Sequence, residues 1–578
     1  MWNIQNIKLA LIICIVGVLA LLIHLWDQKY EPLEKPSTSI TSLAPDLSSN
    51  TNPSTTTMGS TALPISTAFP SPFEPAVQQA NPMDQQFHTS GSLITVTTDL
   101  LEAKINLNGG NLIHTSILNY SESTKDKTPI TLLTDQANAF YVAQSGLVGI
   151  GLPTNTPLIF TSAQTSYTQE PGQPLIINLV YQSPNGLKIT KQYTFEPKSY
   201  LIKVNYLIQN QSKNPWEGRF YGQLLRVPPV NQNHNILMSY STFTGAAYSS
   251  QNTHFEKLSF SNLAGSNLKE TSIGGWVAMV QHYFISAWIP DAAQSSLLYS
   301  RVLDGNVYAM GLANPAVTVA PGSIISTGAS LYVGPTLSNQ LEAAAPNLNL
   351  TVDYGWLWFI SELLFWVMTH IQHFIGNWGL SIIAVTILIK AVFYPLSAKS
   401  YRSMAKMRML QPKMKEIKAQ YGDDRQAIGK ATMELYKKEK VNPLSGCLPI
   451  LIQIPVFIAL YWMLMASVEL RQAPFIFWIK DLSVNDPYFI LPVLMGLSMF
   501  LQQRLNPPPS DPTQAKVMMF LPVIFTALFL GFPSGLVLYW IVNNCVGILQ
   551  QWYILGKVKK ESVVKNAKHY YPNQHPKK

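Results

Sequence analysis

Charged residues and cysteines are scarce in this sequence. Of its 578 residues only 12% are charged, and all three cysteines fall inside apolar runs. Residues 87–345 contain no cysteine, so no disulfide framework holds that region together. The spacing of Cys14, Cys447 and Cys545 also excludes a cysteine metal site. A P-loop or other nucleotide-binding motif is absent as well, and we predict neither a cofactor nor enzymatic activity.

Hydrophobic residues, in contrast, make up 47% of the chain. Several apolar runs approach the length of about 20 residues that spans a bilayer. A chain of this length is expected to hold more than one folded unit. The composition therefore predicts a multi-domain membrane protein with a soluble portion.

The formal net charge of +9 is concentrated in two blocks. Residues 398–441 hold twelve Lys and Arg against five Asp and Glu, and residues 557–578 hold seven Lys against one Glu. These blocks carry +7 and +6, so the rest of the chain totals −4. Both blocks flank apolar runs, as cytoplasmic loops do under the positive-inside rule.

Two segments precede the middle region. Ile7–Trp26 is an apolar run without a small-residue cleavage site, and it predicts a retained signal-anchor span within residues 1–30. Residues 31–86 are rich in Pro, Ser and Thr and have little to bury, which is typical of a disordered linker.

Residues 87–345 show the alternation of strands. In Leu101–Leu107 every second residue is apolar, and Gly109-Gly110 offers a turn directly afterwards. Two further apolar runs meet across Pro184-Asn185-Gly186, which is a hairpin signal. Many such short runs predict a large all-β sandwich.

The pattern becomes helical and apolar after Pro346. Within residues 346–375, the run 356–374 gathers its polar residues on one face, which predicts an interfacial amphipathic helix. If this helix crossed the bilayer, the basic block 398–441 would lie on the same side as the β domain. We therefore place it on the outer surface.

Five further spans follow, and with the N-terminal anchor they predict a polytopic α-helical bundle of six spans. The five are residues 376–396, 446–467, 487–503, 517–531 and 534–555. They form a core at 376–556, which includes a cytoplasmic helical hairpin at 398–441, and a basic cytoplasmic tail follows at 557–578. Both termini then lie in the cytoplasm and residues 31–375 in the periplasm. In the hairpin, Gly422 is expected to end one helix and Asp423 or Asp424 to cap the next.

Lys390 lies inside the first of these five spans. A lysine at the bilayer centre costs about 2.5–3.5 kcal/mol. One explanation is snorkelling, because Lys390 is about six residues, or roughly 9 Å, from the inner end of its span. The other is a wet pocket, because Thr386 and Tyr394 share its helical stripe and other spans also carry polar residues at depth. These residues are Gln453, Thr526, Asn543 and Asn544. A single polar residue in a span usually forms a hydrogen bond between helices, but several together favour a polar cavity.

Several segments resemble the YidC/Oxa family of bacterial inner-membrane insertases. They are MAKMRMLQPK, LYKKEKVNPLSGCLPILIQIPVF, SVELRQAPF, DPYFILPVLMG and LPVIFTALFLGFPSGLVLYWIVNN. The match runs over about residues 355–555 and is dense. The six-span plan with a large periplasmic domain is similar to the Gram-negative branch.

The resemblance implies a membrane protein insertase, or chaperone, of the bacterial inner membrane. Such a protein moves nascent membrane-protein clients from the cytoplasm into the lipid bilayer through a hydrophilic, positively charged intramembrane groove. It acts alone or with the Sec translocon (SecYEG and SecDF). A ribosome contact through the basic tail and the cytoplasmic hairpin is one expectation; a solvated or lipid-bound tail is the other.

The resemblance also assigns roles to residues. Lys390 occupies the family's cationic groove position, where many relatives have Arg, and Thr386 matches the groove threonine. Where relatives often show two tyrosines, this chain has Tyr539-Trp540. We add Gln453 and Asn543 to the groove. Apolar client segments are expected to slide along the third and fifth spans at Ile454, Phe457, Val523 and Phe525.

The sequence also allows two other functions. An ion or solute transporter could use Lys390 as its site, but the sequence has no convincing internal repeat of the kind that many transporters show. An anchored periplasmic enzyme or sugar-binding module would use the β-sandwich, but no paired carboxylates can be placed there, and a fold alone does not give a function.

Overall fold

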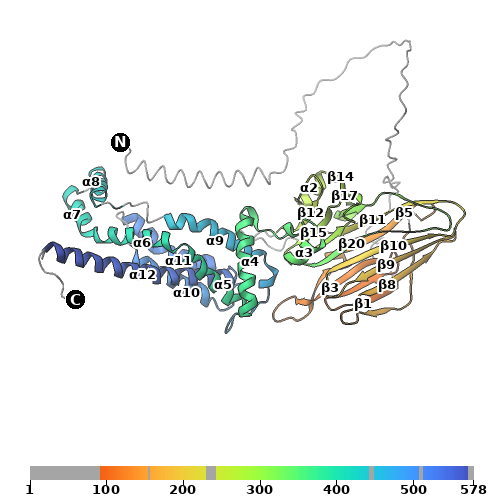
Figure 1. The fold of residues 1–578 in the computed structure, drawn as a ribbon, viewed down its shortest axis with the longest axis horizontal. Helices are drawn as coiled ribbons and strands as arrows, with labels where there is room; N and C mark the ends of the chain where they lie inside the picture. The colour runs from red at the N-terminus through yellow and green to blue at the C-terminus, as the bar shows by residue number, and fades with distance from the viewer. Residues whose placement is uncertain are drawn as a thin grey trace, which may run out of the picture. The chain divides into compact units, whose positions relative to one another are not determined.

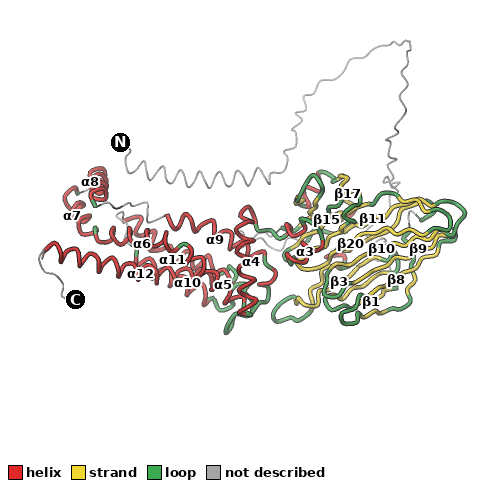
Figure 2. The backbone as a smooth tube through the Cα atoms, viewed as in Figure 1, coloured by secondary structure: helices red, strands yellow, loops and turns green. Residues whose placement is uncertain are grey.

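The computed structural model describes residues 92–153, 156–229, 243–422, 424–439, 441, 448–506 and 512–570. The chain divides into two units, Met1–Gln86 and Phe87–Lys578, and the description below concerns the second. The predicted anchor Ile7–Trp26 and linker 31–86 lie outside the described residues. Figure 2 shows strands gathered in one part of this unit and helices in the other.

The strands form two sheets (Figure 1). The 11-stranded sheet runs β14-β17-β18-β11-β5-β3-β2-β1-β7, with β19 on β11 and β4 on β3. Its strands are β1 (Leu93–Thr97), β2 (Leu101–Asn106), β3 (Asn111–Ser121), β4 (Pro129–Leu133), β5 (Tyr141–Gly149), β7 (Ser166–Thr168), β11 (Trp216–Arg226), β14 (Lys269–Ile273), β17 (Ser295–Leu303), β18 (Val307–Ala313) and β19 (Val317–Val319). The 9-stranded sheet runs β13-β12-β15-β16-β20-β10-β9-β8-β6. Its strands are β6 (Thr161–Ser162), β8 (Leu175–Gln182), β9 (Leu187–Phe195), β10 (Leu201–Asn210), β12 (Gly245–Ser249), β13 (Glu256–Leu258), β15 (Trp276–Gln281), β16 (Phe284–Ile289) and β20 (Ile324–Pro335).

The predicted hairpin is confirmed. β8 pairs antiparallel with β9 from Leu175 opposite Phe195 to Gln182 opposite Lys188. Gly186 in the connecting turn has a φ of 82°, which favours glycine. The predicted β-sandwich is present because the alternating residues of both sheets face a common core.

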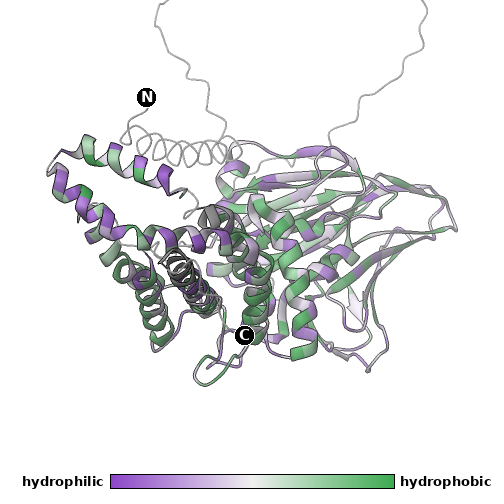
Figure 3. Ribbon diagram, turned by 60° about the vertical axis from the view of Figure 1, so that its left-hand side comes forward, coloured by the Kyte–Doolittle hydropathy of each residue, from purple (hydrophilic) through white to green (hydrophobic). Residues whose placement is uncertain are grey.

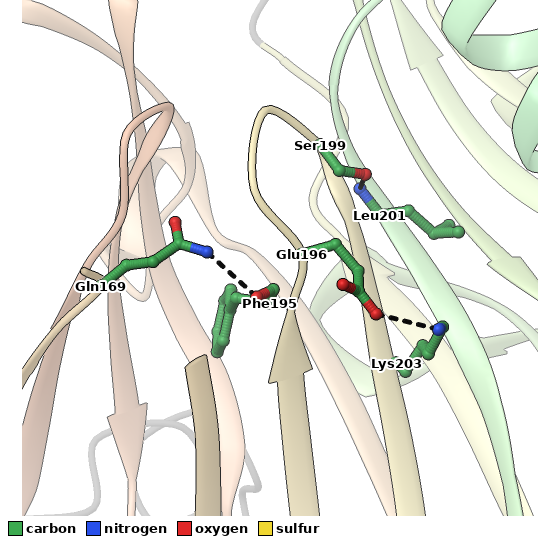
Figure 4. Close-up of polar contacts among 6 residues, drawn as sticks. All are labelled: Gln169, Phe195, Glu196, Ser199, Leu201 and Lys203. Carbon is green, nitrogen blue, oxygen red and sulfur yellow. Dashed lines mark hydrogen bonds and ion pairs between the residues drawn. The ribbon is translucent and has the colours of Figure 1, made fainter. Parts of the chain in front are cut away.

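Aromatic side chains join the two sheets. Phe220 of β11 packs against Tyr206 of β10 at 5.6 Å and against Trp288 of β16 at 6.1 Å between ring centroids. All three rings are buried, and rings at such distances stabilise a core beyond the area that they bury. At the rim, the Gln169 side chain donates to the carbonyl of Phe195 over 3.1 Å, next to an ion pair of Lys203 and Glu196 (Figure 4).

A lysine lies in this core. Lys191 of β9 is fully buried, and its Nζ donates to the carbonyls of Gly109 at 3.3 Å and Ser145 at 3.1 Å. The rings of Tyr193 and Tyr206 lie 5.2–5.3 Å from the same nitrogen. Burial removes water from the ammonium and holds the pKa of Lys191 well below its ordinary value.

The helical part begins after two short helices of the β domain, α2 (Phe260–Gly265) and α3 (Ser338–Ala344). Its helices are α4 (Trp358–Ile375), α5 (Trp378–Val392), α6 (Tyr394–Met409), α7 (Gln411–Tyr421), α8 (Arg425–Lys438), α9 (Leu448–Ala466), α10 (Ile490–Leu505), α11 (Pro512–Phe529) and α12 (Ser534–Tyr570). α12 packs against α5, α6 and α10, and α11 packs against α10. Figure 3 shows hydrophobic residues along much of these helices.

The six predicted spans are not established by helix length. Within the described ranges, no single helix combines the length and the apolar composition of a membrane crossing. The pair α5 and α6, which is bent by 68°, meets both criteria together. Within the predicted span 376–396, α5 ends at Val392 and the chain bends before α6.

The hairpin and the tail also differ from the prediction in detail. Gly422 does end α7, and the Asp424 side chain caps α8 by accepting from the amides of Gln426 and Ala427 at 3.0 Å. The hairpin's first arm is broken between α6 and α7, because Pro412 starts a new helix. The basic tail predicted at residues 557–578 begins as a continuation of α12, which extends to Tyr570. Val558 of this extension is buried with Ala405 of α6, which gives the basic helix an apolar contact.

We predict that Lys191 makes stability depend on pH. Its folded pKa is lowered, so between that pKa and the ordinary value near 10.4 the unfolded chain binds more protons than the folded chain. The free energy of unfolding should therefore rise with pH through this window, and the penalty for burying the lysine should be largest below it. Lys191→Met removes the titrating group. As the pH rises from 7 to 10, the free energy of unfolding should therefore increase less in the variant than in the parent. Thermal unfolding of the detergent-solubilised protein at several pH values measures this, and parallel curves for parent and variant would contradict the prediction.

Candidate intramembrane site around Lys390

The bend between α5 and α6 positions Lys390. Asn377 caps the start of α5 by accepting from the amide of Leu380 at 3.0 Å. Lys390 lies in the last turn, immediately before the break at Phe393. Pro395, in the first turn of α6, has no amide hydrogen to continue the ladder of α5, which accounts for the break.

Lys390 faces the interior of the bundle. Its side chain is 4% exposed, and Ile382, Val385 and Thr386 are buried on the same face. Leu388 and Val392 on other faces of α5 are exposed. Among the residues that the structure describes, no hydrogen bond or ion pair reaches the ammonium of Lys390, whereas the Thr386 hydroxyl donates to the carbonyl of Ile382 at 2.6 Å. The stripe was expected to include Tyr394, but the helix axis bends by 68° before this residue and Tyr394 is exposed.

Amide side chains on α12 bind the neighbouring helices, and one of them contacts Lys390. Gln550 donates to the backbone carbonyl of Lys390 at 3.3 Å, and so joins α12 to the end of α5. Asn544 donates to the hydroxyl of Ser498 on α10 at 2.9 Å. Gln551 donates to the Oδ1 of Asn506, just after α10, at 3.0 Å.

The two glutamines were missed from the sequence, although an adjacent polar pair inside an apolar run was a signal that could have found them. Their Oε1 atoms are buried and have no hydrogen-bond partner within the described part of the chain. Asn543, which was predicted to be in the site, is half-buried next to Asn544.

An aromatic cluster lies nearer the start of α12. Phe457 of α9 is 4.9 Å from Trp540 and 6.0 Å from Tyr539 between ring centroids. Phe529 of α11 packs against Trp540 at 5.8 Å. The indole nitrogen of Trp540 is buried without a partner among the described residues, and the Tyr539 side chain is buried as well.

The residues predicted to contact clients divide into two groups. Ile454 and Val523 are exposed on α9 and α11, Val523 to 65%. Phe457 belongs to the aromatic cluster, and Phe525 is half-buried and packs against Phe529 at 6.1 Å. Gln453, one residue before Ile454, is half-buried. The geometry therefore brings Lys390, Thr386 and the amides of α12 into the interior and leaves two of the four apolar residues on the surface.

Two family models together match most of the chain. The model described as YidC periplasmic domain matches residues 93–367, and the model described as 60Kd inner membrane protein matches residues 370–561. Their junction, between residues 367 and 370, falls inside α4, the first long helix after the β domain.

Similar whole proteins are also known. The chain is 46% identical to the membrane protein insertase YidC of Coxiella burnetii over 559 residues, which covers 95% of this chain and 96% of the relative. It is 50% identical to the membrane protein insertase YidC of Legionella pneumophila over 489 residues, which covers 84% and 88%. A crystal structure of an active YidC insertase with its first transmembrane domain resolved covers 81% of this chain and 93% of its own, at a TM-score of 0.37 and 19% identity.

We predict that the hydrogen bond of Asn544 to Ser498 holds α12 to α10. Asn544→Leu should lower stability by about 1 kcal/mol, the scale of side-chain hydrogen bonds between membrane helices. Adding Ser498→Ala should cost little more, because the partner is already lost. Thermal unfolding of the two single variants and the double variant in detergent measures the coupling. Trp552→Leu, at an exposed position of α12, is the control, and additive losses from the two single changes would contradict the prediction.

Proposed function

This chain belongs to the family of the membrane protein insertase YidC, and we propose that it inserts nascent membrane proteins through a hydrated, positively charged groove around Lys390. The main support for the groove is that Lys390 is buried among the helices and has no partner among the described side chains. An unpaired buried ammonium is unfavourable by several kcal/mol in an apolar surrounding. Water or an anionic client group beside Lys390 would relieve that cost.

The charge of the groove would favour hydrophilic client segments that carry Asp or Glu. At a separation of about 8 Å and an effective dielectric constant of about 20, a lysine attracts a carboxylate by about 2 kcal/mol. Thr386 and Asn543 would add polar neighbours on the way into the groove. Lysine lacks the planar fork of arginine, so a client carboxylate would be held by charge and not by a bidentate contact.

The apolar client segment would lie along α9 and α11. Ile454 and Val523 are exposed and would offer it a hydrophobic surface, while Phe457 and Phe525 would support that surface from behind. Burial of the client's apolar surface in lipid would drive insertion, at about 25 cal/mol per Å². This process needs no bond-making chemistry, and we propose that the protein is not an enzyme.

The topology follows from charge. With the basic residues of α6 to α8 and of the end of α12 in the cytoplasm, both termini would be cytoplasmic and the β-sandwich periplasmic. The cytoplasmic basic helices would then be available to a ribosome, and the Sec translocon (SecYEG and SecDF) remains a proposed partner. The kinship with insertases favours this function over an ion or solute transporter.

Reversal of the charge at position 390 tests the groove. Lys390→Glu should reduce insertion of a single-span client with an acidic translocated segment by at least about tenfold, because attraction of about 2 kcal/mol becomes repulsion. Protease protection of a radiolabelled client in vesicles that contain the variant measures insertion.

Two variants serve as controls. Lys390→Arg should retain insertion, and Lys399→Glu makes the same charge reversal at an exposed position on α6. Normal insertion by Lys390→Glu would remove the charge from the mechanism, as would an equal defect in Lys399→Glu.

A further inference from the structure

The segment that joins α9 to α10 presents large apolar side chains to its surroundings. Phe477 is 79% exposed and Tyr488 is 67% exposed, both in the part of this segment that we term the α9–α10 loop, residues 474–489. Ile476, Val484 and Phe489 are exposed in the same loop. The amide of the Asn377 side chain donates to the carbonyl of Phe475 at 3.2 Å, so the loop lies at the end of the bundle where α5 begins.

The charges of this loop are sorted by sign. Asp486 is 1% exposed, and its carboxylate accepts from the indole of Trp478 at 2.9 Å and from the amides of Tyr488 and Leu491 at 3.0 and 2.8 Å. Asp481 is buried too and accepts from the amide and the hydroxyl of Ser483. The third charged residue of the loop, Lys480, is exposed. The outward surface therefore combines aromatic rings with a cation, and both carboxylates are turned inward.

Hydrogen bonds to the start of α12 stabilise the conformation of the α9–α10 loop. Its backbone is bound to the start of α12, because the amides of Ser534 and Gly535 donate to the carbonyls of Val484 at 2.7 Å and Leu482 at 2.9 Å. Phe477 and Phe489 have φ values of 55° and 57°, a left-handed conformation that costs a bulky residue about 1–3 kcal/mol. Tertiary hydrogen bonds thus support a backbone that displays Phe477.

The neighbouring surface indicates what covers these rings. The loop continues directly into α10, whose outer face exposes Val493, Leu494 and Leu497. In a membrane protein such a helix face contacts lipid tails. The loop lies at one end of that face, at the level where aromatic side chains concentrate at membrane–water interfaces and where a lysine can reach lipid phosphates.

We propose that the α9–α10 loop is a lipid anchor, with Phe477 and Tyr488 inserted into the headgroup layer of the bilayer and Lys480 directed to lipid phosphate. A protein partner, including a second copy of the chain, usually forms several hydrogen bonds across its interface. The exposed surface of this loop consists mainly of aromatic rings and one lysine, and so offers few hydrogen-bonding groups. The anchor would fix the depth of α10, and with it the level of the bundle in the membrane.

Site-directed spin labelling tests the anchor in the full chain. Cys14, Cys447 and Cys545 are replaced by Ser, and a spin label is attached at Phe477→Cys or, separately, Tyr488→Cys. The protein is reconstituted without other proteins into vesicles of phosphatidylethanolamine and phosphatidylglycerol. The ratio of oxygen accessibility to nickel-chelate accessibility should be at least about threefold higher at both positions than at the control, because oxygen concentrates in apolar surroundings and the chelate stays in water.

The control label is placed at Ile324→Cys, an apolar residue on β20 that is 61% exposed. Thermal unfolding of each labelled protein verifies the fold, and agreement between two separate positions guards against a local disturbance at either one. Ratios equal to the control would overturn the proposal and leave the surface for a protein partner. Spin–spin broadening at either label that disappears when labelled protein is diluted tenfold with unlabelled protein would overturn it in favour of a second copy.

Discussion

Polar groups inside the helical bundle are costly to leave unpaired, because the surrounding hydrocarbon offers no hydrogen-bond partner. This constraint accounts for the way the helices are joined. Asn544 pairs with Ser498, Gln551 with Asn506, and Gln550 with the carbonyl of Lys390 at the end of α5. The ammonium of Lys390 stands out against this background because its charge is not neutralised by any described side chain.

The bend after α5 connects this constraint to the position of the lysine. Pro395 interrupts the backbone ladder, and the carbonyl of Lys390 becomes the acceptor for Gln550. Because the chain bends at Phe393, the lysine lies in the last turn of α5, and α6 continues along α12 in a new direction. A straight helix would have continued the stripe through Tyr394.

The β-sandwich is built under a different constraint. Its large core is apolar and must be covered by two sheets. Phe220, Tyr206 and Trp288 bring the sheets together. Lys191 is the exception within this core; its partners are neutral carbonyls and aromatic rings. It resembles Lys390 in being a buried lysine without a carboxylate beside it, but it differs in having two carbonyl acceptors.

The sequence by itself determined the local features of this protein. Alternation and turn residues predicted the β8–β9 hairpin, Gly422 and Asp424 predicted a helix end and a cap, and the dense resemblance predicted the family, because all these signals lie within short stretches of chain. Tertiary structure alone decided the bend of α5, the pairing of Gln550 and Gln551, the inward packing of Phe457 and Phe525, and the continuation of α12 onto α6. These depend on which residues far apart in the chain meet, and packing decides that, because a helical stripe shows which side is apolar but not which neighbour covers it.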